Sequence, residues 1–414
     1  MAVDAIDPDA LVLELFATDE GRSDPYSRYL SMRSLAPIHQ SQSSKAWYLT
    51  RYQDCKGVLL DPRFGRGSEV GPDRFGGLAG EEVTQKRQEV SRSSQQNMLF
   101  SDPPDHSRLR NMVSRAFTPK RIDALREQIT KLVDPLLEDM VSLGSVDALE
   151  ALAFPLPVAV IGQLVGVPPE DWASFRTLVR ESTAMIEAFP TVESLERGDQ
   201  AMATMEEYFR DLVKVRRQNP EDDLLSAMIA VEEGGDRLSG EELVATAILL
   251  FAAGFETTTN LIGNGLLALL QHPDQLMRLR GDPGLLPTAI EEMLRYDSPV
   301  QIDARTALEA AEVAGHPVDA GTYVITFLGA ANRDPAIFDE PDSFDIGRVD
   351  NHPLSFGWGI HHCLGAHLAR LEGEIVFGRL LDRCPSIELA GSDPVWRQSV
   401  TLRGLEALPI EIGA

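Results

Sequence analysis

Cys363 closes a glycine-spaced loop, Phe356–Gly365, immediately before a helix-like run at 364–381. A thiolate is easier to keep deprotonated at the N-terminus of a helix, where free backbone N–H groups point towards it. The glycines at 357, 359 and 365 have no Cβ, so the backbone there can turn with positive φ angles and approach a flat cofactor closely. One thiolate in such a loop, with no second cysteine nearby, is typical of an axial ligand to heme iron.

The residues of this loop leave two other interpretations open. Cys363 could be a buried structural cysteine in a glycine-rich turn. It could also belong to a zinc site, because three histidines lie close to it in the sequence: His361, His362 and His367. Structural zinc sites usually take four ligands from separated pairs, whereas these candidates all lie in one loop and one helical turn.

A second unusual stretch, Ala253–Thr258, lies in the middle of a long apolar helix pattern. Ser239-x-x-Glu242 has the spacing of a capping box, and the helical pattern after it extends to about Gln271. A glycine, a carboxylate and successive threonines are locally unfavourable inside a helix, and sequences break local rules of this sort mostly at functional sites. The alternative is a buried acid that pairs with an arginine elsewhere, beside threonines that bond to their own helix.

These stretches, in this order, resemble the cytochrome P-450 family. The cysteine loop has the spacing Phe-x-x-Gly-x-His-x-Cys-x-Gly of the family's heme-binding loop, and 253–258 is similar to the oxygen-binding stretch of its long distal helix. Glu292 and Arg295, with Arg348 further on, resemble the family's Glu-x-x-Arg pair and its later arginine. The resemblance extends from about residue 25 to the end of the chain.

The resemblance implies a role for each of these residues. Cys363 would be the proximal ligand of heme b, Glu256 and Thr257 would supply protons, and Gly254 would leave room for oxygen. The remaining implied positions are contacts to the heme (His106, Arg110, Arg305, His361, Phe356 and Gly357), a structural network (Glu292, Arg295 and Arg348) and walls of a substrate pocket (Phe100, Leu249, Ala253, Val300 and Leu402). The segments around 98–100 and 179–189 are also expected to line that pocket.

Composition sets broad limits on the class of protein. The chain has 414 residues, of which 43% are hydrophobic and 25% charged, as in an ordinary globular protein. Its net charge of −26 argues against nucleic-acid binding. Three cysteines are too few for a disulfide framework, there is no signal-peptide pattern, and the longest apolar run, Leu243–Phe255, is too short to cross a bilayer. We therefore expect a cytoplasmic protein without a membrane anchor.

The periodicity predicts a mainly α fold with small β-sheets. The resemblance further implies that this fold has the shape of a triangular prism with a long central distal helix. Residues 1–24 are expected to be a loose arm, 25–414 a single domain and 66–97 a long mobile loop. Further predictions are mostly helical structure over 106–270, helices at 25–35 and 287–295, and strands near 37–40, 46–50, 313–318, 323–327, 399–402 and 408–412.

The resemblance implies a heme-thiolate monooxygenase that inserts one oxygen atom of O2 into a lipophilic small molecule by hydroxylation or epoxidation, for example in tailoring a polyketide, macrolide or terpenoid. Electrons would come from NAD(P)H through a ferredoxin and a ferredoxin reductase, and the protein would be a monomer. A locally basic segment that includes Arg115 and Lys120 is either a solvated helix face or an anion and docking surface. Oxidative coupling, peroxide-driven oxidation and a non-catalytic recruitment role remain alternatives.

Overall fold

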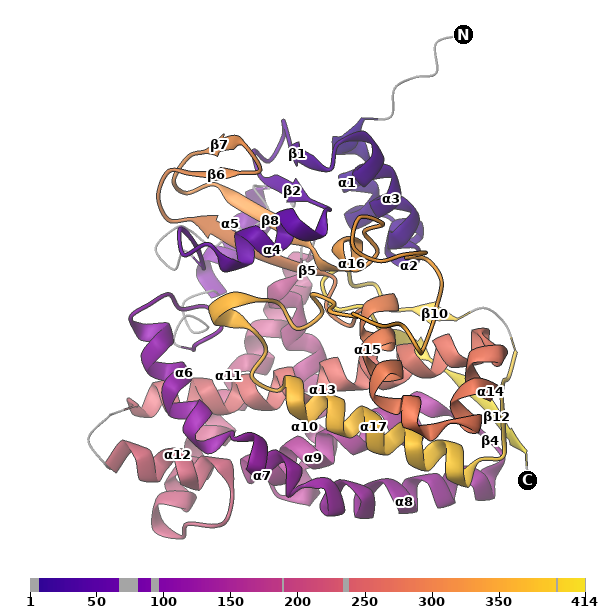
Figure 1. The fold of residues 1–414 in the computed structure, drawn as a ribbon. Helices are drawn as coiled ribbons and strands as arrows, with labels where there is room; N and C mark the ends of the chain where they lie inside the picture. Colours follow the sequence, from indigo (N-terminus) through magenta and orange to yellow (C-terminus); the bar gives the residue numbers. More distant parts are fainter. Residues whose placement is uncertain are drawn as a thin grey trace.

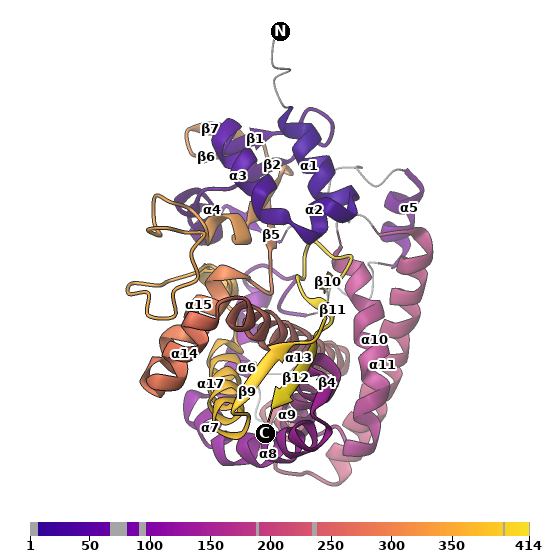
Figure 2. The same ribbon diagram turned by 90° about the vertical axis from the view of Figure 1, so that its right-hand side faces the viewer.

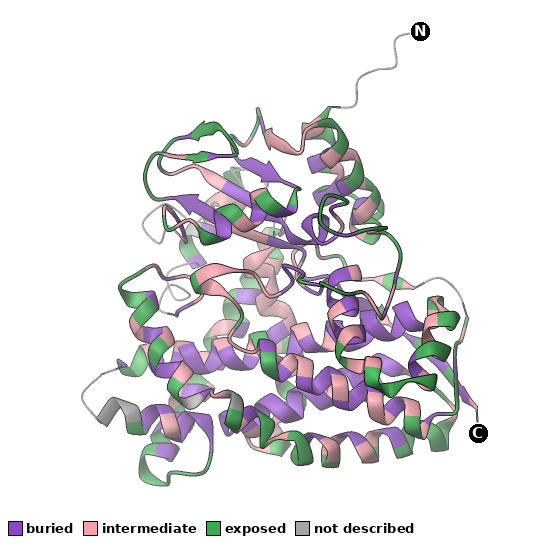
Figure 3. Ribbon diagram, in the orientation of Figure 1, coloured by how far each residue is buried: buried purple, intermediate pink, exposed green. Residues whose placement is uncertain are grey.

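The N-terminal helices and the five-stranded sheet form one part of the molecule, and the long helices, with a smaller sheet beside them, form the other (Figure 1). The structure is a computed structural model that describes residues 7–66, 81–90, 97–187, 190–233, 238–391 and 394–413. Buried residues gather along the central helices and strands (Figure 3). The mainly α architecture with small sheets agrees with the prediction from the sequence.

The helices have the following bounds: α1 (Pro8–Ala17), α2 (Asp19–Ser23), α3 (Pro25–Leu35), α4 (Tyr52–Leu60), α5 (Glu81–Val90), α6 (Asp105–Ala116), α7 (Pro119–Asp123), α8 (Arg126–Leu143), α9 (Pro155–Val165), α10 (Trp172–Ser182), α11 (Val192–Gln218), α12 (Leu224–Glu233), α13 (Gly240–Gln271), α14 (Pro273–Gly281), α15 (Leu286–Tyr296), α16 (Leu328–Ala331) and α17 (Ala366–Arg383). Short turns of other helix types are η2 (Leu149–Ala153), η3 (Pro169–Asp171), η4 (Thr183–Ile186), η5 (Pro283–Leu285) and η6 (Gly359–His361).

The strands are β1 (Ile38–Gln40), β2 (Trp47–Leu49), β3 (Phe64–Gly65), β4 (Ser145–Asp147), β5 (Ile302–Ala307), β6 (Ala311–Val313), β7 (His316–Val318), β8 (Tyr323–Phe327), β9 (Ser386–Leu389), β10 (Val395–Trp396), β11 (Leu405–Ala407) and β12 (Pro409–Gly413). The largest sheet has the order β1-β2-β8-β5-β3, in which β2 and β8 are parallel. A three-stranded sheet, β4-β12-β9, packs near α8 and α13 (Figure 2).

The N-terminal helices belong to the packed fold, and the expected loose arm at 1–24 is wrong for the part that is described. Leu15 and Phe16 of α1 are buried in one cluster with Tyr29 of α3 and with Tyr48 and Phe327 of the large sheet. Asp7 and Thr18 cap α1 and α2 through their side chains. The four-residue spacing of buried positions in α1 was too short a signal to predict this packing.

The central helix α13 begins and ends as the sequence predicted. The Ser239 side chain accepts from the Glu242 backbone, and the Glu242 side chain reaches back to the Ser239 N–H, which completes a capping box. The same Glu242 carboxylate also binds the guanidinium of Arg108 on α6. By length and composition α13 could span a membrane, but 61% of its most apolar window is buried inside the protein, as for the core helix of a soluble fold.

Two local predictions fail. Residues 399–402 form bends and one isolated bridge, between Leu402 and Val300, in place of the expected strand. Within the expected loop at 66–97, residues 81–90 form α5, and most of the others lie outside the described residues. Both segments take their conformation from contacts with distant parts of the chain, and periodicity does not report such contacts.

Candidate functional site

The loop before α17 holds Cys363 in a defined turn. Gly357 and Gly359 have φ angles of +67° and +71°, so both use the conformational freedom that glycine provides. Gly365 has φ −83° and does not use this freedom, because it already lies at the N-terminal cap of α17. The Cys363 N–H donates to the carbonyl of Phe356 at 2.9 Å, which closes the loop.

The surroundings of the Cys363 thiol act on its pKa in opposite directions. Burial among protein atoms raises the pKa, whereas the backbone N–H groups of Gly365 and Ala366 and the guanidinium groups of Arg110 and Arg370 lower it. The residue nevertheless keeps exposed surface. Exposed surface on a cysteine with cationic groups and free N–H groups nearby is the environment of a cysteine that can act as a metal or heme ligand.

The histidines near Cys363 do not converge on one point. The His361 ring lies against His106, with ring centroids 4.2 Å apart, and His367 Nε2 lies 2.8 Å from Asp123. Across the described part of the chain, no group of three or more His, Cys, Asp or Glu side chains is placed to hold a metal ion. The arrangement therefore does not support the zinc interpretation.

A set of nitrogen atoms without partners lies near His361. His106 is 2% exposed, and neither of its ring nitrogens has a hydrogen-bond partner. Arg305 Nη2 and His361 Nε2 are also buried and unpaired. Buried donors are normally satisfied, so this set fits an anionic ligand such as the two propionates of heme, which would supply carboxylate acceptors.

Arg66 and Asp303, which no sequence motif indicated, hold this set in place. Asp303 accepts from Arg305 at 2.6 Å and from Arg66 at 2.8 Å. The two guanidinium groups hold the pKa of Asp303 well below its usual range, against the opposing effect of burial. Burial, with Arg66 and Arg305 nearby, lowers the pKa of His361 to about 2. Asp303 and Arg305 are two residues apart on β5, so the strand period could have revealed their shared face.

Arg110 lies one turn after His106 on α6, as predicted, but it contacts the cysteine loop directly. Its Nη2 donates to the carbonyl of His362 at 2.5 Å. Burial lowers the pKa of Arg110, and the Cys363 thiolate would act in the opposite direction. Arg110 thus connects the thiol loop with the helix that carries His106.

On α13, the side chains of Glu256 and Thr257 both have partners. The Thr257 hydroxyl donates to the carbonyl of Ala253 at 2.8 Å, and the buried Glu256 carboxylate pairs with the guanidinium of Arg397. Ala253 is exposed and Thr257 half-buried, one turn apart on a largely buried helix. The alternative interpretation, a buried acid paired with an arginine beside a threonine bonded to its own helix, therefore agrees with the structure. The side of α13 that carries Ala253 is nevertheless exposed.

The role expected for Gly254 needs correction. A Cβ at this position would lie 2.9 Å from the side chain of Ile161 on α9. The missing side chain therefore allows α9 and α13 to pack closely, and the structure gives no indication that it leaves room for oxygen.

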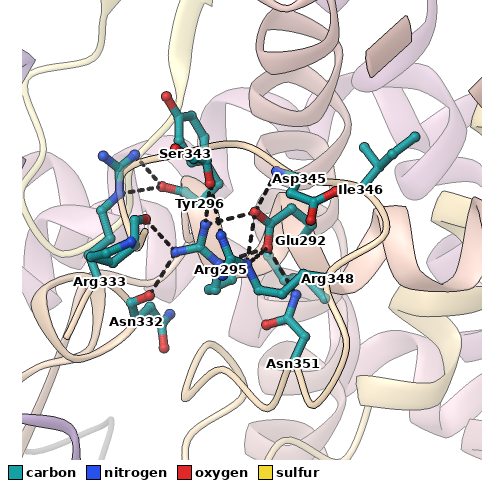
Figure 4. Close-up of polar contacts among 12 residues, drawn as sticks. Glu292, Arg295, Tyr296, Asn332, Arg333, Ser343, Asp345, Ile346, Arg348 and Asn351 are labelled. Atoms are coloured by element: carbon teal, nitrogen blue, oxygen red, sulfur yellow. Dashed lines mark hydrogen bonds and ion pairs between the residues drawn. The ribbon is translucent and has the colours of Figure 1, made fainter. Parts of the chain in front are cut away.

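The three residues predicted to form a structural network do come together (Figure 4). Glu292 and Arg295 are fully buried and joined by two bonds of 2.7 Å, and Arg348 Nε lies 3.1 Å from the same carboxylate. Further bonds reach Glu292 from the Asp345 N–H and the Asn351 amide, and Arg295 donates to the carbonyls of Asn332, Pro341 and Ser343. The network ties α15 to the segment that leads to the cysteine loop.

Comparisons with known proteins agree with this geometry. A family model described as cytochrome P450 matches residues 172–283 and 284–399. Cytochrome P450 107B1 of Saccharopolyspora erythraea is 43% identical over 97% of this chain and 99% of its own length. This chain belongs to the cytochrome P450 family. The polyketide biosynthesis cytochrome P450 PksS of Bacillus subtilis is 40% identical, covering 95% of this chain and 97% of that protein.

The fold comparison points to the same family. The crystal structure of P450BioI in complex with an acyl carrier protein that carries hexadec-9Z-enoic acid has a TM-score of 0.88 and 39% identity, over 95% of this chain and 99% of that one. Other relatives are named as monooxygenases or hydroxylases. The chain is thus a cytochrome P450 monooxygenase, with a heme iron cofactor that the residues around Cys363, His106 and Arg305 fit.

The residues expected to line the substrate pocket of this cytochrome P450 lie in three parts of the fold. Leu249 and Ala253 are one turn apart on α13, and Val300 and Leu402 face each other across an isolated bridge. Phe100 is half-buried in the turn before α6. Phe189 lies outside the described residues. Whether these side chains share one pocket stays a prediction.

Proposed function

We propose that this cytochrome P450 inserts one oxygen atom of O2 into a lipophilic small molecule of secondary metabolism, with a polyketide or macrolide as the first class to test and a terpenoid as the next. The expected pocket side chains, from Phe100 to Leu402, are apolar and would favour a substrate with few charges. The similarity to PksS, a protein named for polyketide biosynthesis, supports this class.

The residues of this chain would divide the work as follows. When bound, heme supplies the activation of O2 and the transfer of one oxygen atom. Cys363 would be its proximal ligand, while His106, Arg305 and His361 would hold its propionates. Thr257 would hold a proton at Oγ1, and Glu256 would replace that proton from solvent. The donors and the thiol together keep the cofactor in one orientation.

The observation that carries the proposal is the position of Cys363 just before α17, where the residue keeps exposed surface and the N–H groups of Gly365 and Ala366 lie near its thiol. Cys363→Ala should abolish the diagnostic Soret band of the reduced, CO-bound protein. Cys384→Ala changes a buried cysteine at the other end of the same helix and should keep the band. A normal band in Cys363→Ala would contradict the assignment of the ligand.

Substrate screening would test the class of reaction. Addition of polyketide lactones, terpenoids and fatty acids should produce a low-to-high-spin Soret shift for at least one class. Turnover of that compound with NADPH, ferredoxin and ferredoxin reductase should give a product heavier by one oxygen atom. A coupled product without added oxygen would indicate oxidative coupling, turnover with peroxide alone would indicate a peroxide-driven enzyme, and no turnover with any class would favour a recruitment role.

The form in which the substrate arrives is a separate point. P450BioI was crystallised with a fatty acid attached to an acyl carrier protein. The same screen should therefore include a free fatty acid and its carrier-bound thioester. A Soret shift only with the carrier-bound form would indicate that the enzyme has a carrier protein as a second partner, in addition to the ferredoxin. For the cell we propose a cytoplasmic monomer, which gel filtration and fractionation would test.

A further inference from the structure

The partner of Glu256 comes from a distant part of the chain. The carboxylate pairs with the guanidinium of Arg397, and the two side chains are only 5% and 11% exposed. Arg397 directly follows β10, and its N–H donates to the carbonyl of Gly404 at 2.9 Å, so the residue belongs to the hairpin formed by β10 and β11. The acid of the central helix is therefore held by the C-terminal hairpin.

This hairpin is anchored on both sides of Arg397. Arg403 lies over the ring of Trp396 at 3.5 Å and bonds to Asp297 at 2.6 Å. The carboxylate of Glu187, from the segment after η4, accepts a hydrogen bond from the Ser399 hydroxyl and another, at 3.3 Å, from the Val400 N–H. The backbone that carries Arg397 is consequently fixed by these contacts. A side chain that positions another group requires such a fixed backbone.

Charged groups from other elements also surround Arg397. Burial lowers its pKa to about 10, and Arg180 and Arg176 of α10 act in the same direction, while Glu406 of β11 and Glu187 oppose them. Arg180 pairs with Glu406 at 2.9 Å, and both side chains are partly exposed. Arg397 thus lies between a buried acid and ion pairs that reach solvent.

We propose that Arg397 is a positioning residue that fixes the orientation and charge of the Glu256 carboxylate and thereby controls its proton exchange with solvent. The inference rests on the proposed proton-supply role of Glu256. An opposite charge at contact distance favours the ionised carboxylate, so this carboxylate can take up a proton only when the ion pair loosens. Because the guanidinium is attached to the hairpin of β10 and β11, movement of that hairpin would set how often this happens.

The test uses the heme-loaded protein without substrate. The reduced protein is mixed with oxygenated buffer between pH 6 and 9, in H2O and in D2O, and the return of the ferric Soret spectrum is timed. Loss of the guanidinium in Arg397→Gln or Arg397→Met should move the midpoint of the pH–rate profile upwards by at least about one unit, because the neighbouring acid then ionises less readily. Arg397→Lys keeps a charge and should restore most of the profile.

Two further variants distinguish a failure of the role proposed for Arg397 from a failure of the role proposed for Glu256. Gln398→Ala changes the next residue of the same hairpin, whose side chain faces Arg22, and should behave as wild type. Glu256→Gln should remove the pH-dependent step and its solvent isotope effect. If Glu256→Gln changes the profile but both neutral Arg397 variants match wild type, or if Gln398→Ala shifts it equally, the role of Arg397 is wrong. If Glu256→Gln itself matches wild type, the proposed function of Glu256 fails first.

Discussion

Glu292 and Glu256 are both buried carboxylates bound to arginine, and they differ in how completely they are bonded. Glu292 accepts from two arginines, a backbone N–H and an amide, and its side chain is 0% exposed. Glu256 pairs with one arginine, and its Oε1 has no hydrogen bond of good geometry. The first carboxylate joins α15 to the segment before the cysteine loop, and the second lies beside Thr257 on α13.

The difference indicates why one site is structural and the other is suited to exchange. A carboxylate whose acceptor positions are all used gains nothing by moving, and a completely satisfied network fixes the surrounding backbone. A carboxylate with one charged partner has to lose only that ion pair before its orientation or its protonation can change. The same pair of residue types would thus serve folding in one region and, under the proposed role of Glu256, proton exchange in the other.

The largest effect should come from breaking the complete network. Glu292→Gln leaves Arg295 and Arg348 without a counter-charge and should destabilise the protein by about 3–5 kcal/mol, with loss of bound heme, as measured by urea unfolding and the Soret absorbance. Asp342→Asn removes an exposed partner of Arg333 and should cost at most about 1 kcal/mol. Equal stability of the two variants would contradict the comparison.

A smaller effect on stability should come from breaking the ion pair of Glu256 and Arg397. Arg397→Met leaves Glu256 buried without its partner and should destabilise by about 1–3 kcal/mol, and the double variant Glu256→Gln with Arg397→Met should recover most of that loss. The double variant Glu292→Gln with Arg295→Met should recover little, because the carbonyls of Asn332, Pro341 and Ser343 also lose their donor. Urea unfolding of both cycles measures this, and equal recovery would remove the distinction.

The smallest effect on stability should come from removing charges of exposed side chains. Arg115 and Lys120 are exposed, and replacing both with Gln should slow reduction by ferredoxin several-fold at low salt, with the difference shrinking as salt is added. Lys214→Gln on α11 is the control, and the free energy of unfolding of each variant should lie within about 1 kcal/mol of the wild-type value, because pairs of exposed charges contribute little. Reduction rates that do not depend on the two residues would exclude this docking surface.

Local patterns were sufficient where the residues themselves determine the structure. Ser239 and Glu242 give the start of α13 because a capping box is built from four consecutive residues. Gly357 and Gly359 likewise adopt the left-handed turn that the cysteine loop needs. The set Glu292, Arg295 and Arg348 could be recognised only through the family, since an i,i+3 ion pair is common on any helix.

What the sequence could not provide was the partner of each buried group. Arg397 lies far from Glu256 along the chain, and its position depends on how the C-terminal hairpin packs. Gly254 was assigned to the oxygen site, but its neighbour Ile161 is known only once α9 and α13 are docked. Charge and size limit which residues can be paired, and the tertiary fold decides which of them meet.

The shared carboxylate of Glu242 has a consequence for assembly of the holoprotein. It closes the first turn of α13 and at the same time binds Arg108, two residues after His106 on α6. Binding of the cofactor to α6 should therefore slow amide hydrogen exchange in the first turn of α13 as well, although that turn lies well before Ala253–Thr258. The two helices would become ordered together, as one cooperative unit of the native ensemble.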